Sequence, residues 1–164
     1  NLAMLKDATQ RAARYGVQFS YVIVGPKLGA KHPLFQRLPE ARGSGHNFGG
    51  GIFHGLCSGH PTVQAFYEET FSKLFKETPE LAGLILIVAG ESVYHCWIRG
   101  EASVPCPRCQ ARTPEEVVAE AAGVVHRAVK SAQPKAWVAV WSYSPFGWEK
   151  TDRLDLVRHV AAEH

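Results

Sequence analysis

The sequence of 164 residues is poor in net charge and in cysteine, and it has no long apolar run. The net charge is +3 and no block of lysines or arginines occurs, so we expect no nucleic acid partner. No apolar stretch reaches the roughly 18–20 residues of a membrane-spanning helix, so we expect no membrane partner either. Four cysteines are too few for a disulfide framework at this length, and we expect reduced thiols in a cytoplasmic or periplasmic protein.

The rest of the composition is ordinary for a globular domain. Hydrophobic residues make up 46% and charged residues 20% of the chain, and the length is sufficient for one sizeable core. The first residues, NLAMLKDATQRAARYG, have the pattern of an amphipathic helix rather than of a signal peptide, and they lack an initiating methionine. We therefore expect residues 1–164 to form a single α/β unit that is part of a larger chain.

Helical and strand-like patterns alternate along the sequence. Three runs rich in apolar, β-branched or aromatic residues predict strands, and amphipathic stretches between them predict helices. Strands separated by helices of this length pair in parallel through right-handed crossovers. The expected order is αβαβαβα, with strands over residues 17–25, 82–90 and 135–143, and helices over 2–15, 60–79, from 114 onward and over 151–163.

Particular residues mark the ends of these helices. Gly16 suits the end of the first helix, and His60 before Pro61 suits the start of the second. Residues 113–116, Thr-Pro-Glu-Glu, form a capping-box pattern with proline at the first helical position. In the second helix, the apolar positions predict a buried face made of Val63, Phe66, Tyr67, Phe71, Leu74 and Phe75.

Two folds agree with this order of elements. The segments after the strands are long, with a stretch over 26–59 that we expect to be irregular except for a short helix at 33–41. The segments before the strands are short, and this asymmetry is typical of a (β/α)8 TIM barrel, whose working face lies at the carboxyl ends of its strands. A small open α/β sheet is the alternative, although the glycines at 43–51 make a poor nucleotide-binding turn.

Glu91 follows the apolar strand at 82–90 and is the candidate catalytic residue. A carboxylic acid between apolar walls has a raised pKa, which suits a general acid near neutral pH. The alternative is a solvent-exposed glutamate at the end of a strand. Glycoside hydrolysis usually needs a second carboxyl group, and we expect it outside this chain rather than at Glu149 or Asp152.

Aromatic and histidine side chains near the strand ends suit a sugar-binding site. Sugars stack their flat C–H faces on aromatic rings, and such rings beside a carboxylate are typical of carbohydrate sites. The alternative for Trp141 is packing within the sheet, and His54 can equally serve a structural role. The candidate substrate-binding residues are His54, Tyr94, His95, Trp141, Tyr143 and Trp148.

Three cysteines and a histidine lie close together in the sequence. Cys106 and Cys109 form a CxxC pair, and His95 and Cys96 precede it by about ten residues. Zinc binds such a set of ligands in tetrahedral geometry, and a site closed by four protein ligands is structural. Zinc is therefore a possible structural cofactor, and we expect catalysis to require no cofactor. The alternatives are a pair of reduced thiols that pack the loop, or a disulfide from Cys96 to one of the other two.

Parts of residues 30–145 resemble a known family. HPLFQRLPEARG, GLCSGHPTVQAFYEETFSKLFKETPELAGLILIVAGES and the HC…CPRC segment resemble the central part of bacterial (β/α)8 glycoside hydrolases, with β-N-acetylhexosaminidase-like and α-glucuronidase-like barrels the most similar. The resemblance implies that Glu91 is the acid/base residue. Gly90 stands where hexosaminidases carry an aspartate, so the resemblance does not imply substrate-assisted cleavage of an N-acetyl sugar.

The sequence therefore predicts part of a glycoside hydrolase that acts on an oligosaccharide or glycoside. Two other functions remain open at this point. A non-catalytic relative would bind glycans without turnover, and a zinc-stabilised α/β module would act through protein contacts.

Overall fold

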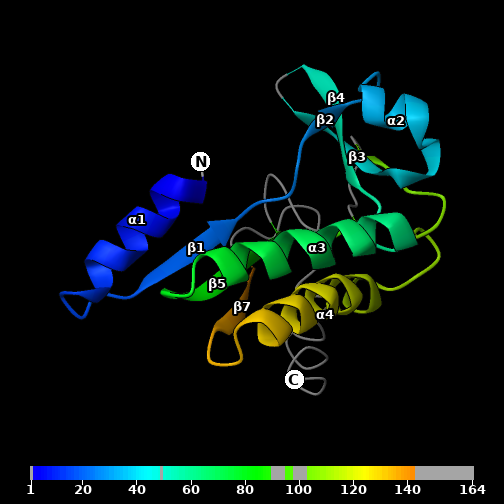
Figure 1. The fold of residues 1–164 in the computed structure, drawn as a ribbon. Helices are drawn as coiled ribbons and strands as arrows, with labels where there is room; N and C mark the ends of the chain where they lie inside the picture. The colour runs from blue at the N-terminus through cyan, green and yellow to red at the C-terminus, as the bar shows by residue number, and fades with distance from the viewer. Residues whose placement is uncertain (1, 49, 90–94, 98–102, 143–164) are drawn as a thin grey trace.

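The computed structural model describes residues 2–48, 50–89, 95–97 and 103–142, which form a mixed α/β fold (Figure 1). The predicted final helix at 151–163 lies outside these residues. The elements in chain order are α1 (Leu2–Ala13), β1 (Phe19–Ile23), β2 (Leu28–Gly29), α2 (Pro33–Arg37), a 3-10 turn η1 (Pro39–Ala41), β3 (Arg42–Phe48), β4 (Gly51–Leu56), α3 (Pro61–Glu77), β5 (Leu81–Ala89), β6 (Ser103–Val104), α4 (Pro114–Ala132) and β7 (Trp137–Ser142).

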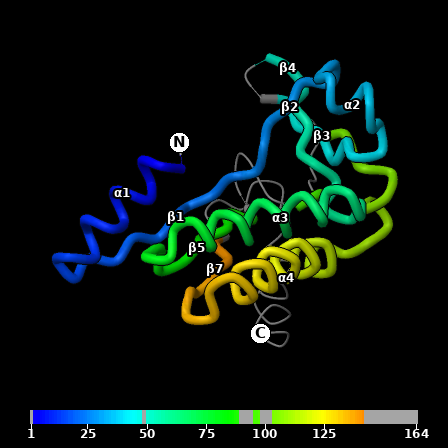
Figure 2. The backbone as a smooth tube through the Cα atoms, viewed as in Figure 1, coloured from blue at the N-terminus to red at the C-terminus, as the bar shows by residue number. Residues whose placement is uncertain are grey.

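The three predicted strands form one parallel sheet in the order β1-β5-β7. The strands of this sheet are therefore neighbours in the same order as in the chain, and the connections between them contain α3 and α4. The two helices lie side by side across one face of the sheet, as Figures 1 and 2 show. This arrangement confirms the predicted parallel pairing.

The main core lies between this sheet and the two helices. Alternate residues of β5, Leu84, Leu86 and Val88, are buried toward the helices because successive strand side chains point to opposite faces. The buried residues of α3 recur every four positions: Val63, Tyr67, Phe71 and Phe75. The prediction that Phe66 belongs to this buried face is wrong, since its side chain is 52% exposed. Phe66 precedes Tyr67, and one residue turns the helix by about 100°.

The other face of the parallel sheet is only partly covered. Val22 and Ile85 are partners in register on this face, as are Ile87 and Trp141. Val22 and Trp141 are 48% and 46% exposed. In the described part of the chain, no strand pairs with the outer edge of β1 or of β7. Within the described ranges, the sheet thus has one packed face, one half-exposed apolar face and two open edges.

A second, antiparallel sheet has the strand order β2-β4-β3-β6. The expectation of a largely irregular segment over 26–59 is therefore wrong, although α2 and η1 lie within the predicted short helix. Strand β3 reads RGSGHNF, and glycine and asparagine are rare in strands, so its pattern does not indicate one. A Cβ at Gly45 would lie 2.7 Å from the His54 ring, so the glycine allows the two strands to pair closely.

The predicted helix caps are present. The Thr62 amide donates a hydrogen bond to Nδ1 of His60 at 3.2 Å, at the start of α3. At the start of α4, the Glu116 amide donates to Thr113 Oγ1 at 3.4 Å, and the Thr113 amide donates to Glu116 Oε2 at 3.1 Å. Gly16 has a positive φ of 70° just after α1, a conformation that favours glycine.

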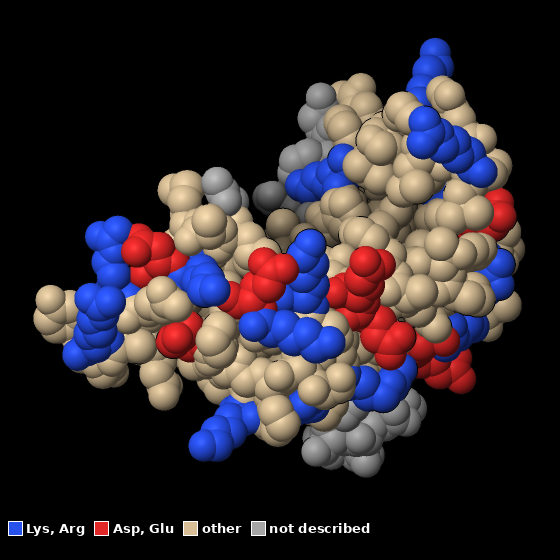
Figure 3. All heavy atoms as spheres, viewed as in Figure 1, with Lys and Arg blue, Asp and Glu red and all other residues tan. Residues whose placement is uncertain are grey.

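Charged side chains of both signs are intermixed on the face that Figure 3 shows. Lys73 and Glu77 form one pair on α3, at 3.9 Å. None of the helices in the described ranges combines the length and the hydropathy needed to cross a membrane.

Candidate functional site

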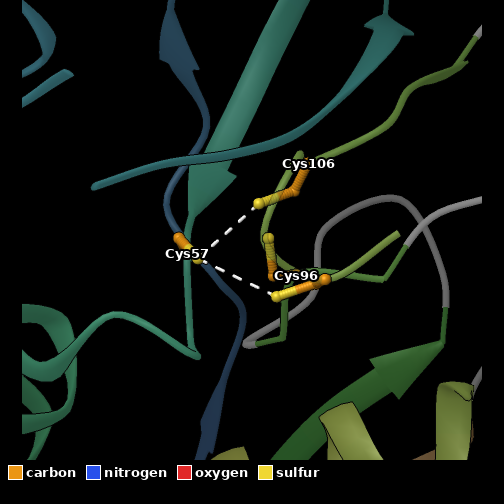
Figure 4. Close-up of side chains that lie close together, drawn as sticks. Cys57, Cys96 and Cys106 are labelled. Atoms are coloured by element: carbon orange, nitrogen blue, oxygen red, sulfur yellow. Dashed lines mark hydrogen bonds between the residues drawn. The ribbon is translucent and has the colours of Figure 1, made fainter. Parts of the chain in front are cut away.

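Four cysteine side chains meet where the two sheets adjoin. Cys57 follows β4, Cys96 lies beyond the end of β5, and Cys106 and Cys109 belong to a turn before α4. The sulfur of Cys57 lies 3.6 Å from that of Cys106 and 3.9 Å from that of Cys109. All four sulfurs lie within 4.8 Å of one another, and Figure 4 shows three of them pointing toward a common centre. Each residue is at most 2% exposed, and all four thiols are free.

Backbone hydrogen bonds hold each thiol in place. The Cys57 amide donates to the Ala41 carbonyl at 2.8 Å, which joins the end of β4 to the start of β3. The Cys109 amide donates to the Cys106 carbonyl at 3.1 Å and so closes the CxxC turn. The Cys96 amide donates to Ser58 Oγ at 3.1 Å. Three separate segments are thus fixed around the same point.

Glycine 43 provides the space for this cluster. A Cβ at Gly43 would lie 2.8 Å from the Leu56 backbone and 2.9 Å from the Cys96 sulfur, closer than side-chain atoms approach in proteins. The next amide, of Ser44, donates to the Cys96 sulfur at 3.3 Å. Strand β3 therefore approaches the cluster with its backbone, and a backbone N–H reaches a thiol directly.

The arrangement of sulfurs matches a tetrahedral metal site. A metal that holds four thiolates at about 2.3 Å separates neighbouring sulfurs by about 3.8 Å, and the two distances from Cys57 bracket this value. The thiols also differ in acidity. Hydrogen bonding with Cys106 raises the pKa of Cys57, whereas hydrogen bonding with Cys109 and Cys57 lowers the pKa of Cys106.

His95 is not part of this group of sulfurs. Its Nε2 hydrogen-bonds the Val88 carbonyl, and its Nδ1 accepts a hydrogen bond from the Trp97 amide at 3.1 Å. Both ring nitrogens therefore have backbone partners. Burial lowers the pKa of His95 to about 4, so the ring is neutral at pH 7.

The structure therefore brings together three of the four predicted metal ligands, with Cys57 in the fourth place instead of His95. Cys57 lies 49 residues before Cys106, so no local spacing indicates it. The strand pairing alone shows that the end of β4 meets this turn.

The predicted substrate-binding residues that the structure describes lie in different environments. Trp141 is near the carboxyl end of β7, on the half-exposed face of the parallel sheet. His54 is 6% exposed within the antiparallel sheet, where its Nδ1 hydrogen-bonds the Gly43 carbonyl at 3.0 Å. The Phe35 ring packs edge-on against it at 6.1 Å. The predicted residues outside the described ranges are Glu91, Tyr94, Tyr143 and Trp148.

Comparison with known proteins finds solved structures of similar fold at low sequence identity. No family model matches the chain, and no curated protein matches it either. A GH36 alpha-galactosidase from Geobacillus stearothermophilus is structurally similar with a TM-score of 0.52 and 14% identity, over 96% of this chain and 24% of that one. An alpha-galactosidase from Lactobacillus brevis gives a TM-score of 0.51 and 12% identity, over 96% of this chain and 23% of that one.

This chain thus spans about a quarter of the length of those two enzymes. At such identities the likeness concerns the fold. It does not extend to either of the two hydrolase families that the sequence resembles. The fold of this chain is therefore similar to one part of the fold of these two enzymes.

Proposed function

We propose that this chain is part of the catalytic (β/α)8 domain of a glycoside hydrolase. The supporting observation is the parallel sheet in sequential order β1-β5-β7, with both connecting helices on one face. In a doubly wound open sheet the strand order reverses and helices cover both faces. Sequential order with helices on one side is instead the geometry of a barrel wall, whose inner face is apolar and is filled by side chains.

The substrate site of this proposal lies at the carboxyl ends of the strands. The carboxyl ends of parallel strands all lie at the same end of the sheet, so the residues that follow β5 and β7 in the sequence belong to that end. Glu91 follows β5 in the sequence and is the proposed general acid, and Trp141 near the end of β7 is a proposed stacking surface for a sugar ring. The second carboxylate comes from another strand of the complete protein.

The test is turnover of aryl glycosides, alpha-galactosides included, by the complete protein and its Glu91→Gln variant. We expect turnover to fall by about 10²–10⁴-fold while glycan binding persists, because the amide cannot donate the proton. Glu80→Gln is the matched control, since Glu80 precedes β5 at the opposite edge of the sheet. Equal turnover in Glu91→Gln and wild type would contradict the role of Glu91. A wild-type protein that binds glycans without turnover would favour the non-catalytic alternative.

We also propose that the four thiols hold a structural zinc ion. The sulfur separations of 3.6 and 3.9 Å suit a single tetrahedral ion, and four protein ligands leave no open position for a substrate. Zinc and iron both accept four thiolate ligands. The proposed role is therefore to join the antiparallel sheet to the segment beyond β5, at the carboxyl end of the parallel sheet.

Elemental analysis of the purified protein tests this site. We expect about one zinc per chain and its loss in a Cys57→Ser variant, because three thiolates bind zinc more weakly than four. Iron in equal amount would identify a different metal at the same site. Metal-free protein whose four thiols react at once with a thiol reagent would contradict the site altogether.

A further inference from the structure

The proposed zinc site carries a charge that the protein must balance. Four thiolates around Zn²⁺ have a net charge of −2, and all four cysteines are at most 2% exposed. A buried net charge is costly unless an opposite charge or hydrogen-bond donors lie close to it. The Ser44 amide supplies one donor to the Cys96 sulfur. A cationic side chain close to the thiols would balance the remaining negative charge.

Arg112 lies beside the cluster on the side of Cys109. Its backbone amide donates to the Cys109 carbonyl at 3.1 Å, so the residue is fixed to the CxxC turn. Its Nη1 and the Cys109 sulfur each lie 3.4 Å from the position that a Cβ on Gly59 would occupy. Nη1 of Arg112 and Sγ of Cys109 are therefore at most twice 3.4 Å apart, and both lie beside Gly59.

The guanidinium is also held from the other side by α4. Nη1 donates to Glu120 Oε2 at 2.7 Å, and Nε lies 4.0 Å from Glu116 Oε2. The Arg112 side chain is 32% exposed, so solvent screens these charges only partly. Arg112 thus contacts two carboxylates of α4, while its Nη1 also lies near the Cys109 sulfur.

We infer that Arg112 is a positioning residue of the metal centre. Its guanidinium balances the negative charge of the four thiolates and shields them from the carboxylates of α4. This inference rests on the proposed zinc site. Among the described residues, Arg108 also lies close to this turn; it approaches Gly59 with its Cδ methylene, and its side chain is exposed. Arg108 therefore serves as the matched control on the same turn.

The experiment measures zinc affinity by competition with a chelator, in Arg112→Gln, Arg112→Lys and Arg108→Gln variants of the complete protein. Partners of metal ligands contribute about 10–100-fold to metal affinity, so we expect Arg112→Gln to weaken zinc binding by that factor. Arg112→Lys should recover most of the affinity because it keeps the charge, and Arg108→Gln should bind as wild type does. The cobalt-substituted spectra should retain four-thiolate absorption throughout, because the ligands are unchanged.

A Glu120→Gln variant separates a charge effect from a purely structural one. It removes the shorter of the two ion pairs to α4 but leaves the guanidinium beside the thiols, so we expect zinc affinity equal to or above that of wild type. Equal weakening in Glu120→Gln and Arg112→Gln would overturn the inference, as would wild-type affinity in Arg112→Gln. Absence of zinc binding by the wild-type protein would instead contradict the zinc site itself.

Discussion

At the scale of single residues, the glycines of the antiparallel sheet differ sharply in their surroundings. Gly43 is packed against the Leu56 backbone and the Cys96 sulfur, whereas a Cβ at Gly55 would meet nothing within 4 Å. Both residues lie in strands of the same sheet, β3 and β4. An added methyl group therefore has very different consequences at the two positions.

We expect Gly43→Ala to weaken zinc binding at least about tenfold and to destabilise the protein by about 1–3 kcal/mol. The methyl group must displace either a strand or the Cys96 thiol, and overpacking of a dense site typically costs this much. Metal competition and chemical denaturation measure the two effects. Gly55→Ala is the control and should leave both unchanged; wild-type behaviour of Gly43→Ala would show that β3 adjusts freely.

Two phenylalanines of α3 offer a second matched pair. Phe71 is 1% exposed in the main core, and Phe66 on the neighbouring side of the helix is 52% exposed. We expect Phe71→Ala to lower the free energy of unfolding by about 3–5 kcal/mol, since it leaves a cavity between α3 and the sheet. Phe66→Ala should cost less than about 1 kcal/mol. Urea denaturation of both variants checks this, and equal losses would mean that the buried face of α3 is assigned incorrectly.

At the scale of elements, the cysteine cluster connects the end of the antiparallel strand β4 to the chain between β5 and α4. Cys57 lies directly after β4, and the other three thiols belong to the chain between β5 and α4. In the described residues, β3 pairs with β4 along most of its length but with the two-residue β6 at only two positions. A metal bound to all four thiols would therefore hold β3 and β4 in place.

Removal of zinc by a chelator should accordingly loosen β3 and β4 first. We expect their amides to exchange with deuterium at least about tenfold faster. Without zinc, local opening of these two strands no longer has to break the metal–thiolate bonds. The amides of β5 and of α4 beyond its first turn should exchange as before, and added zinc should restore protection. Equal acceleration in both sheets would indicate that the metal supports the whole fold, and no acceleration would exclude a structural role.

At the scale of the whole molecule, the parallel sheet has an apolar face that the helices of the described residues leave partly exposed. Val22 in β1 and Trp141 in β7 lie on this face, each nearly half exposed. Apolar faces of parallel sheets are normally covered on both sides. In the proposed barrel this face is the filled interior, and the open edges of β1 and β7 pair with further strands.

The proposed barrel predicts that position 22 is inaccessible in the complete protein. We expect a Val22→Cys thiol to resist a maleimide reagent until the protein is denatured. Met4→Cys, on the outer surface of α1 where Met4 is 70% exposed, should react within minutes. Peptide mass spectrometry distinguishes these sites from the four native cysteines. Equal labelling rates at the two positions would favour the open α/β sheet instead of the barrel.

The sequence alone determined the features that depend on neighbouring residues. The capping box at Thr113, the histidine cap at His60 and the existence of the strands β1, β5 and β7 follow from patterns a few residues long. Their parallel pairing follows from the alternation of strands and helices along the chain. The proximity of Cys106 and Cys109 is of the same kind, because two intervening residues keep both on one turn.

Only the tertiary structure decided which distant groups meet. Cys57 completes the thiol cluster across 49 residues because β4 ends beside the CxxC turn, and no local spacing contains that information. The buried ring of His95 hydrogen-bonds backbone groups of Val88 and Trp97, because a buried imidazole needs hydrogen-bond partners. Packing determines which groups those partners are. The glycine-rich strand β3 forms because backbone pairing with β4, rather than side-chain pattern, stabilises it.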